Sequence, residues 1–439
     1  MAVPVGPDPS LQDLLAARPA FEMHARDGLC FEDVPLNAVA DAYGTPTWVY
    51  GAGSIRARHG AVADALRGAG LDVHVHYAVK ANDHLAILGL FHGLGTGADV
   101  VSLGEFMRAR RAGIAAADVV FSGVGKRLDE LSATIAAGIG QINVESAEEL
   151  EMISAVAQAA GRTAKVVLRM NPDVDAGTHE KITTGKADNK FGIPARDVPR
   201  IYALAAALPG VEPVGIALHI GSQILSPAPY AEAYGIAAAM VGKLRGDGFA
   251  VSVLDLGGGL GIGYGDEPGI SLSAFASTVR REVGGLGVRL LLEPGRYLVG
   301  PAGVLLASVI LQKRTAEKRF VVLDAAMNDL ARPSLYDSWH GILPVSAAQF
   351  AGPVAAADIV GPVCETADCF ATGREVPEMG PGSRVAILDA GAYGAVMSST
   401  YNARPRAAAV LVDGGKVQLI TPRQTIEALW AAEIVPEIG

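Results

Sequence analysis

The stretch HVHYAVKAN, residues 74–82, has the pattern of a buried β-strand that ends in a lysine. Its apolar residues continue to Val79, and Lys80 and Asn82 follow where the strand ends. A cationic side chain at the inner end of a buried strand needs a partner, because burial of an unpaired charge is unfavourable. Lys80 is therefore the first candidate functional residue. The alternative is a surface lysine whose stem lies along the protein while its amine reaches water.

Eight short apolar runs, of which this is the first, alternate with segments of helical spacing. The expected strands lie at 73–79, 97–102, 118–123, 141–145, 165–171, 214–221, 251–257 and 289–293. The helical segments include 54–69, 104–113, 127–138 and 146–161. Strands rich in valine, isoleucine and leucine that alternate with helices pair in parallel, because each crossover covers a face of the sheet. The first five runs begin about 21–24 residues apart. This spacing favours an α/β fold with a (β/α)8 TIM-type barrel, and an open, doubly wound sheet is the alternative.

The pattern changes beyond about residue 310, where apolar runs are separated by turns. The runs are RFVVLDAAM (319–327), SRVAILDAGAYG (383–394) and AAAVLVDGGKVQLI (407–420), and DGG at 413–415 is typical of a hairpin. A chain of 439 residues also suggests two domains. We therefore expect a barrel over 50–310 and a second, mainly β domain formed by 1–49 plus 311–439. The strand-like pieces in 28–50 should pack with this second domain, and the long connection 175–193 should overhang one barrel face.

Composition excludes several classes of protein. The formal net charge of −10 argues against nucleic acid or an anionic membrane as the main partner. The three cysteines, Cys30, Cys364 and Cys369, are too few and too scattered for a disulfide framework or a metal site, which fits a cytoplasmic protein. The first residues lack the layout of a signal peptide, and no uncharged run predicts a membrane span.

Candidate functional residues gather where the expected strands end, which is where barrel enzymes place their active sites. They are Lys80, His219, the run GGGLGIGYG (257–265) and the segment 293–296. The glycines offer backbone N–H groups that no side chain obstructs, so they could cradle a phosphate. The alternative is that they only form a tight turn. The run is not a dinucleotide fingerprint, because Ile262 takes the place of the last glycine.

A phosphate cradle facing a lysine suggests pyridoxal 5′-phosphate. Lys80 would bind the cofactor aldehyde as a Schiff base once a neighbouring cation or partial burial frees its amine. Glu293 would lie beside the pyridine nitrogen and keep the ring protonated, which makes the ring a better electron sink. His219 could stack on the ring, and Ser222 could donate to the phosphate. No metal is expected.

Seven motifs occur in order along the chain and together resemble the diaminopimelate decarboxylases, in the alanine racemase-like class of pyridoxal-phosphate enzymes. They are YAVKAN (77–82), HIGSQ (219–223), LGGGLG (256–261), EPGR (293–296), MNDLARPSLY (327–336), GPVCETAD (361–368) and DAGAYG (389–394). The resemblance covers about residues 28–435. It implies a cofactor-binding barrel, a β domain and a homodimer whose active sites are shared between subunits.

The resemblance also implies roles for the matching residues. Lys80 would be the Schiff-base lysine, and Cys364, supplied by the partner subunit, the proton donor. The implied cofactor-binding residues are Lys80, His219, Ser222, Gly257, Gly258, Gly259, Glu293, Gly295, Arg296 and Tyr393. The implied substrate-binding residues are Arg296, Arg332, Tyr336, Glu365 and Tyr393. A thiol suits a proton donor, since it is mostly protonated at neutral pH. The alternative for Cys364 is a small buried hydrophobic residue.

The implied reaction is the decarboxylation of meso-2,6-diaminopimelate to L-lysine and CO2. The substrate has a second carboxylate and ammonium at its remote carbon. Arginine can pair with the carboxylate through two hydrogen bonds, and Glu365 can pair with the ammonium. The alternatives are a decarboxylase acting on ornithine, arginine or another diamino acid, a racemase, and a non-catalytic protein that only binds the cofactor.

Overall fold

The structure is a computed structural model that describes residues 8–175 and 190–437. The chain divides into two compact units. The first, here called the β unit, comprises Met1–Ile55, Gly263–Pro268 and Val299–Gly439, and the second, here called the barrel unit, comprises Arg56–Ile262 and Gly269–Leu298. The two units are described separately below.

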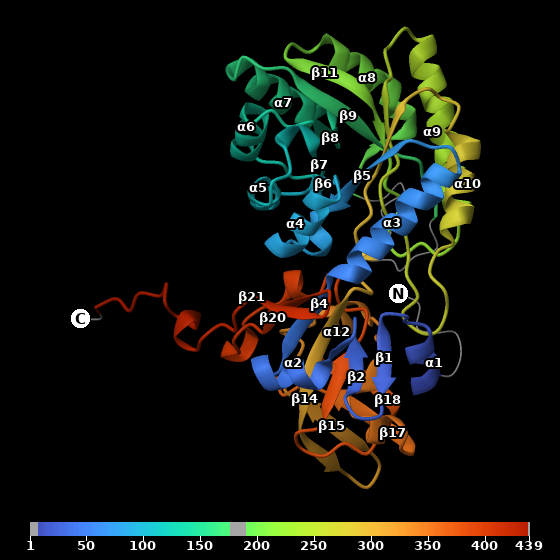
Figure 1. Cartoon of the computed structure of the whole chain (residues 1–439). Helices are drawn as coiled ribbons and strands as arrows, with labels where there is room; N and C mark the ends of the chain where they lie inside the picture. The colour runs from blue at the N-terminus through green and yellow to red at the C-terminus, as the bar shows by residue number, and fades with distance from the viewer. Residues whose placement is uncertain (1–7, 176–189, 438–439) are drawn as a thin grey trace. The chain divides into compact units, whose positions relative to one another are not determined.

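The barrel unit is built on a closed ring of parallel strands (Figure 1). In ring order they are β5 (Val73–Ala78), β6 (Gly97–Val100), β7 (Val119–Phe121), β8 (Gln141–Val144), β9 (Ala164–Asn171), β11 (Val211–Ala217), β12 (Val253–Asp255) and β13 (Arg289–Leu292), and β13 pairs with β5. The short β10 (Ile193–Pro194) pairs with β9 outside this ring. Each of the eight strands overlaps one of the eight expected apolar runs. The (β/α)8 barrel is confirmed, and the doubly wound alternative is wrong.

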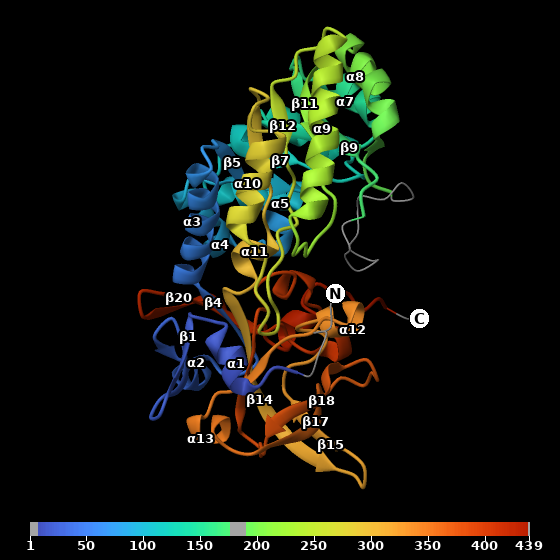
Figure 2. The ribbon, with the colours of Figure 1, turned by 90° about the vertical axis from the view of Figure 1, so that its right-hand side faces the viewer.

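Helices connect the strands and lie outside the ring, and the first of them, α3, precedes β5 (Figure 2). They are α3 (Ala52–Gly68), α4 (Leu85–Gly93), α5 (Leu103–Arg111), α6 (Leu128–Ala136), α7 (Ala147–Ala159), α8 (Val198–Ala207), α9 (Ala228–Gly246), α10 (Leu272–Glu282) and α11 (Arg296–Val299). Serine begins three of them: the hydroxyls of Ser102, Ser146 and Ser271 each accept a backbone N–H of the first turn. These hydrogen bonds satisfy donors that have no partner within the helix. The four expected helical segments are confirmed as α3, α5, α6 and α7.

The β unit contains a large sheet and a small one. The large sheet has the order β18 (Cys369–Pro377), β17 (Val354–Val360), β15 (Arg319–Leu323), β14 (Gly303–Arg314), β4 (Thr47–Gly51), β20 (Ala408–Asp413) and β21 (Lys416–Thr421), and β19 (Arg384–Ile387) pairs with β14 and with β16 (Ile342–Pro344). The small sheet is β1 (Phe21–His24), β2 (Gly28–Phe31) and β3 (Val34–Pro35). The helices of this unit are α1 (Leu11–Ala16), α2 (Leu36–Tyr43), α12 (Arg332–Tyr336) and α13 (Ala347–Phe350).

Two expectations about the β unit are confirmed. The strand β4 from the segment 28–50 pairs with β14 and β20, so this early segment does belong to the sheet. The DGG turn joins β20 to β21 as a hairpin, with Gly414 and Gly415 at φ 57° and 75°. Only glycine adopts such left-handed angles without strain.

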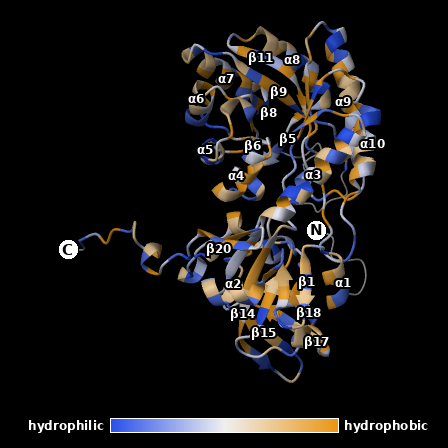
Figure 3. Cartoon of the chain, in the orientation of Figure 1, coloured by the Kyte–Doolittle hydropathy of each residue, from blue (hydrophilic) through white to orange (hydrophobic). Residues whose placement is uncertain are grey.

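The strands are largely hydrophobic, and hydrophilic residues lie mainly on helices and connections (Figure 3). The apolar residues of the chain therefore form the cores of the two units. Among the described residues no helix has the length and apolarity needed to cross a membrane. Most of the connection 175–193, residues 176–189, lies outside the described part of the chain, so its expected position over the barrel stays a prediction.

Candidate active site

Lys80 lies in a single 3-10 turn, η1 (Val79–Ala81), that directly follows β5. Its Nζ donates to Oδ2 of Asp99 on β6 at 2.6 Å, and the Asp99 side chain has no solvent exposure. The side chain of Lys80 itself is 31% exposed. Lys80 is therefore not simply a surface lysine whose amine reaches water, because a buried carboxylate on the neighbouring strand binds its amine.

Glu293 follows β13 and is buried in the same end of the ring. Its backbone N–H donates to the carbonyl of Gly257, and its Oε1 accepts the Asn143 side-chain amide at 3.3 Å. Burial, together with the negative charges of Asp255 and Asp99, raises the pKa of Glu293 well above its ordinary value. The ionised form of such a carboxyl is unfavourable without a cationic partner, which a protonated ring nitrogen would supply.

The three consecutive glycines touch the backbone of two neighbouring strand ends. A methyl carbon on Gly257 would lie 2.1 Å from the carbonyl oxygen of Leu218, and one on Gly258 would lie 2.2 Å from that of Glu293. Gly257 and Gly259 also have φ 69° and 97°. The glycines do more than form a tight turn. They also let the chain pass directly over the ends of β11 and β13.

His219 follows β11 and lies against this glycine run. The N–H of Gly258 donates to its Nδ1 at 3.3 Å, so Nδ1 carries no proton. Burial and the positive charges of Arg169 and Lys80 lower the pKa of His219 well below its ordinary value. The ring is therefore neutral near neutral pH, which suits stacking on an aromatic cofactor beside a cationic lysine.

The EPGR segment lies against both the lysine turn and the loop after β11. Gly295 has no room for a side chain, because a methyl carbon there would lie 3.0 Å from the Cβ of Ala81. Arg296 is buried, and its Nη2 donates to the hydroxyl of Ser222 at 3.1 Å. The barrel unit thus brings together the residues that the sequence predicted for it: Lys80, His219, Ser222, Gly257, Gly258, Gly259, Glu293, Gly295 and Arg296.

The β unit carries the remaining predicted residues, and Cys364 and Glu365 lie on an exposed turn. Exposure of Cys364 makes the alternative of a small buried hydrophobic residue wrong. Its backbone N–H donates to Oδ1 of Asn402 at 2.9 Å. The buried carboxylate of Asp368 closes the turn by accepting the backbone N–H groups of Val363 and Met327. The turn is therefore fixed from two other segments of this unit, those of Asn402 and Met327.

Arg332 begins the short helix α12 and Tyr336 ends it. Arg332 is only 1% exposed, and its guanidinium lies 5.1 Å from the Tyr264 ring. Its Nη1 donates to the carbonyl of Ala392, the neighbour of Tyr393, and the hydroxyl of Ser334 donates to Ala367 in the Cys364 turn. The motifs MNDLARPSLY, GPVCETAD and DAGAYG thus meet within the β unit.

Sequence reasoning missed three polar residues of the barrel interior: Asp99, Asn143 and Asp255. All three are buried, Asp99 and Asp255 each as the only charged residue of its strand and Asn143 on a strand that also carries Gln141. A single charged or amide residue inside an apolar run was the feature that could have indicated them, because such a residue needs a partner inside the barrel.

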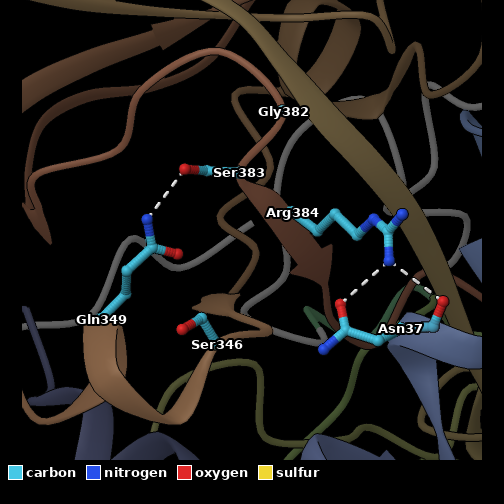
Figure 4. Close-up of a pocket in the computed structure, with 6 residues that line it drawn as sticks. All are labelled: Asn37, Ser346, Gln349, Gly382, Ser383 and Arg384. Carbon is cyan, nitrogen blue, oxygen red and sulfur yellow. Dashed lines mark hydrogen bonds between the residues drawn. The ribbon is translucent and has the colours of Figure 1, made fainter.

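A separate pocket in the β unit is lined by Asn37, Ser346, Gln349, Gly382, Ser383 and Arg384 (Figure 4). Its polar groups bind one another: Gln349 donates to the Ser383 hydroxyl at 2.8 Å, and Arg384 donates to Asn37. None of the predicted site residues lines it. No group of three or more His, Cys, Asp or Glu side chains within 8–175 and 190–437 is arranged to hold a metal ion.

The fold and the barrel residues define the class of protein. Residues 52–300 match the family described as pyridoxal-dependent decarboxylase, pyridoxal binding domain. The (β/α)8 barrel with a β unit is likewise the fold of a lysine/ornithine decarboxylase from Vibrio vulnificus, at a TM-score of 0.76 and 22% identity.

Closer relatives fix the family within this class. The chain is 48% identical to the diaminopimelate decarboxylase of Zymomonas mobilis, over 92% of this chain and 96% of that one. Two solved diaminopimelate decarboxylases, each in complex with L-lysine, are also similar. The enzyme from Helicobacter pylori has a TM-score of 0.87 and 37% identity, over 91% of this chain and 99% of that one. The enzyme from M. jannaschii has a TM-score of 0.91 and 34% identity, over 96% and 99%. The chain belongs to the diaminopimelate decarboxylase family, as its motifs predicted, and its cofactor is pyridoxal 5′-phosphate.

Proposed function

We propose that this protein decarboxylates meso-2,6-diaminopimelate to L-lysine and CO2, the last step of lysine biosynthesis. The observation that carries the proposal is the meeting, at one end of the barrel, of an amine, a buried carboxyl and a run of glycines. Lys80, Glu293 and Gly257–Gly259 supply them. These three features fit the aldehyde, the ring nitrogen and the phosphate of pyridoxal phosphate.

The barrel residues would hold the cofactor. Lys80 would bond the aldehyde carbon, His219 would lie against the ring, and Glu293 would bind the ring nitrogen. The phosphate would take the N–H group of Gly259, the Ser222 hydroxyl and the N–H groups of Gly295 and Arg296, because the N–H groups of Gly257 and Gly258 already donate to Asp255 and His219. Tyr393 would also contact the cofactor. When bound, the ring accepts the electron pair that the departing CO2 leaves behind.

The predicted residues of the β unit would serve the substrate. Arg332, with Arg296, would pair with the remote carboxylate, and Glu365 would pair with the remote ammonium. Tyr336 and Tyr393 would line the same substrate. Cys364 would hold a proton on Sγ and deliver it to the substrate Cα after CO2 leaves. Its exposed position supports this role, because a proton donor must reach a substrate rather than a hydrophobic core.

We also propose a cytoplasmic homodimer in which Cys364 serves the site of the partner subunit. In each subunit the barrel domain would span 50–310, and the substrate-side domain would span 1–49 plus 311–439. Three free cysteines support a reducing compartment. Mixing Lys80→Ala chains with Cys364→Ala chains tests the shared site. Activity should partly return, since one of the two mixed sites then has both residues. No recovery in a mixture proved to contain heterodimers would contradict sharing.

The reaction itself is tested by lysine formation from meso-diaminopimelate with added pyridoxal phosphate. Borohydride treatment should fix the cofactor on Lys80, as peptide mapping would reveal. Preference for ornithine over meso-diaminopimelate would refute the proposed substrate and favour the related diamino-acid decarboxylases. Binding of the cofactor with no CO2 release from any diamino acid would favour a non-catalytic carrier.

A further inference from the structure

Asp255 ends β12, directly beside the position where Glu293 follows β13. Its side chain has no solvent exposure, and Glu293 is 5% exposed. Oδ1 of Asp255 accepts the Gly257 N–H at 3.0 Å, and Oδ2 accepts the Gln141 side-chain amide at 3.1 Å. Asp255 is thus fixed from its own strand end and from β8.

One amide connects the two carboxyls. Nδ2 of Asn143 lies 3.4 Å from Oδ2 of Asp255 and 3.3 Å from Oε1 of Glu293. Two adjacent ionised carboxylates in a dry site would repel each other, so one of the two holds a proton. Asp255 accepts three N–H groups, whereas the Glu293 side chain accepts one, so the negative charge belongs on Asp255.

We propose that Asp255 is a positioning residue that orients Glu293 and keeps the ring nitrogen of the cofactor protonated. This inference deepens the proposed function and rests on it. The negative charge of Asp255 is shielded from water, so it acts strongly over a short distance. It favours a proton on Glu293, and it equally favours a proton on a ring nitrogen bound to Glu293. A protonated ring is the better electron sink.

Burial and the Asp255 charge both raise the pKa of Glu293, which agrees with this arrangement. Three further titratable groups face the pair. Asp99 on β6 adds a negative charge, and Lys80 opposes it with a positive one. Tyr234 of α9 is neutral, since burial raises its pKa well above the ordinary value, and its hydroxyl donates to the carbonyl of Leu256. Asp255 thus shares the Asn143 amide with Glu293, while the Asp99 carboxylate is bonded to Lys80.

The test is the protonation of the ring nitrogen, read from the 15N chemical shift of labelled pyridoxal phosphate bound to the whole protein across a pH series. Asp255→Asn keeps the shape of the side chain and removes the charge. The pH at which the ring nitrogen loses its proton should fall by about one to two units, since a buried neighbouring charge has effects of that size. The kcat should fall with it, while the KM for the substrate changes less, because the Asp255 side chain is fully buried.

Two further variants separate this role from general destabilisation. Asp255→Glu keeps the charge and should keep the ring nitrogen protonated as in wild type. Glu149→Gln removes another buried acid of the same barrel and should leave the 15N titration unchanged. An Asp255→Asn protein with the wild-type titration would overturn the inference. The inference would also be overturned if the Asp255→Glu protein lost the ring proton at a pH as low as that of a Glu293→Gln protein. The Asp255→Glu variant decides the matter if Asp255→Asn fails to fold.

The outcomes also distinguish the inference from the function on which it rests. If the wild-type protein binds no pyridoxal phosphate, the proposed function fails. If the wild-type protein binds it with a protonated ring and turns over meso-diaminopimelate, but the Asp255 variants titrate alike, only the role of Asp255 is refuted.

Discussion

Gly258→Ala tests the glycine run as a packing element of the cofactor site. The added methyl carbon would lie 2.2 Å from the carbonyl oxygen of Glu293, where ordinary contact begins at 3.4 Å. The neighbour is backbone at the end of β13, so no side chain can rotate away, and the strand end or the glycine loop must move by about 1 Å. Overpacking of this kind costs about 1–3 kcal/mol, and the rigid neighbour places Gly258→Ala near the upper value.

The expected result is a loss of stability and of cofactor affinity together. A cost of about 3 kcal/mol lowers the Tm of a unit of this size by about 6–12 °C. Pyridoxal phosphate should bind more weakly, because the displaced backbone is that of Glu293, and His219 lies against the same glycine. Thermal unfolding with and without the cofactor measures the first effect, and a spectral titration with pyridoxal phosphate measures the second.

Gly89→Ala is the matched control. Gly89 lies inside α4, and an added methyl carbon there meets no atom within 4 Å. Alanine should stabilise that helix by about 0.5–1 kcal/mol, because it loses less backbone entropy than glycine. The reasoning is refuted if Gly258→Ala keeps the wild-type Tm and the wild-type affinity for the cofactor.

Three further predictions follow from individual side chains. Cys364→Ala should lower the kcat for lysine formation by about 10²–10⁴-fold, the usual contribution of a general acid, whereas Cys369→Ala should stay near wild type; equal rates in the two variants would contradict the assignment. Lys126→Met leaves the Glu149 carboxylate, its partner at 2.6 Å, buried and unpaired, which should cost about 3–5 kcal/mol in denaturant unfolding. Adding Glu149→Leu should recover most of that loss, and an unimproved double variant would show that the pair does not explain it. Burial raises the pKa of Asp329 to about 6, so the folded state prefers the protonated acid and stability falls as pH rises from about 4 to 6. Asp329→Asn should remove this loss of about 3 kcal/mol, measured as the difference from wild type in urea unfolding at each pH, and a difference that does not vary with pH would refute it.

The sequence predicted the barrel well because each strand is a buried apolar run between helices, and that pattern is local. The runs were longer than the strands at some carboxyl ends: 251–257 was expected, whereas β12 ends at Asp255. The extra residues belong to the loop that contains Gly257. Apolarity alone does not separate a strand from a buried loop, since both are shielded from water here.

The polar residues behind the site were not predictable in the same way. Asp99 lies in the run 97–102 and Asp255 in 251–257, and one charged residue hardly alters the average of such a run. What makes each tolerable is a partner distant in sequence: Lys80 for Asp99, and the Asn143 and Gln141 amides for Asp255. These pairings depend on how the ring closes. Arg332 was expected only as a substrate contact. Its burial also depends on pairing between distant segments, because its partners come from separate parts of the β unit.

The pairing of Lys80 with Asp99 also explains why a lysine is stable at this end of the barrel. Replacing a buried ion pair by apolar residues of similar volume is often neutral or stabilising. Stability alone therefore gives no reason to keep a lysine there, whereas a reactive amine does. Once Lys80 is present, Asp99 offsets the cost of placing its charge beside the ring of strands. The acid also holds the amine in place, because both Nζ and Oδ2 belong to the ends of adjacent strands. The position of Lys80 is thus set by the register of β5 and β6 rather than by the flexible side chain alone.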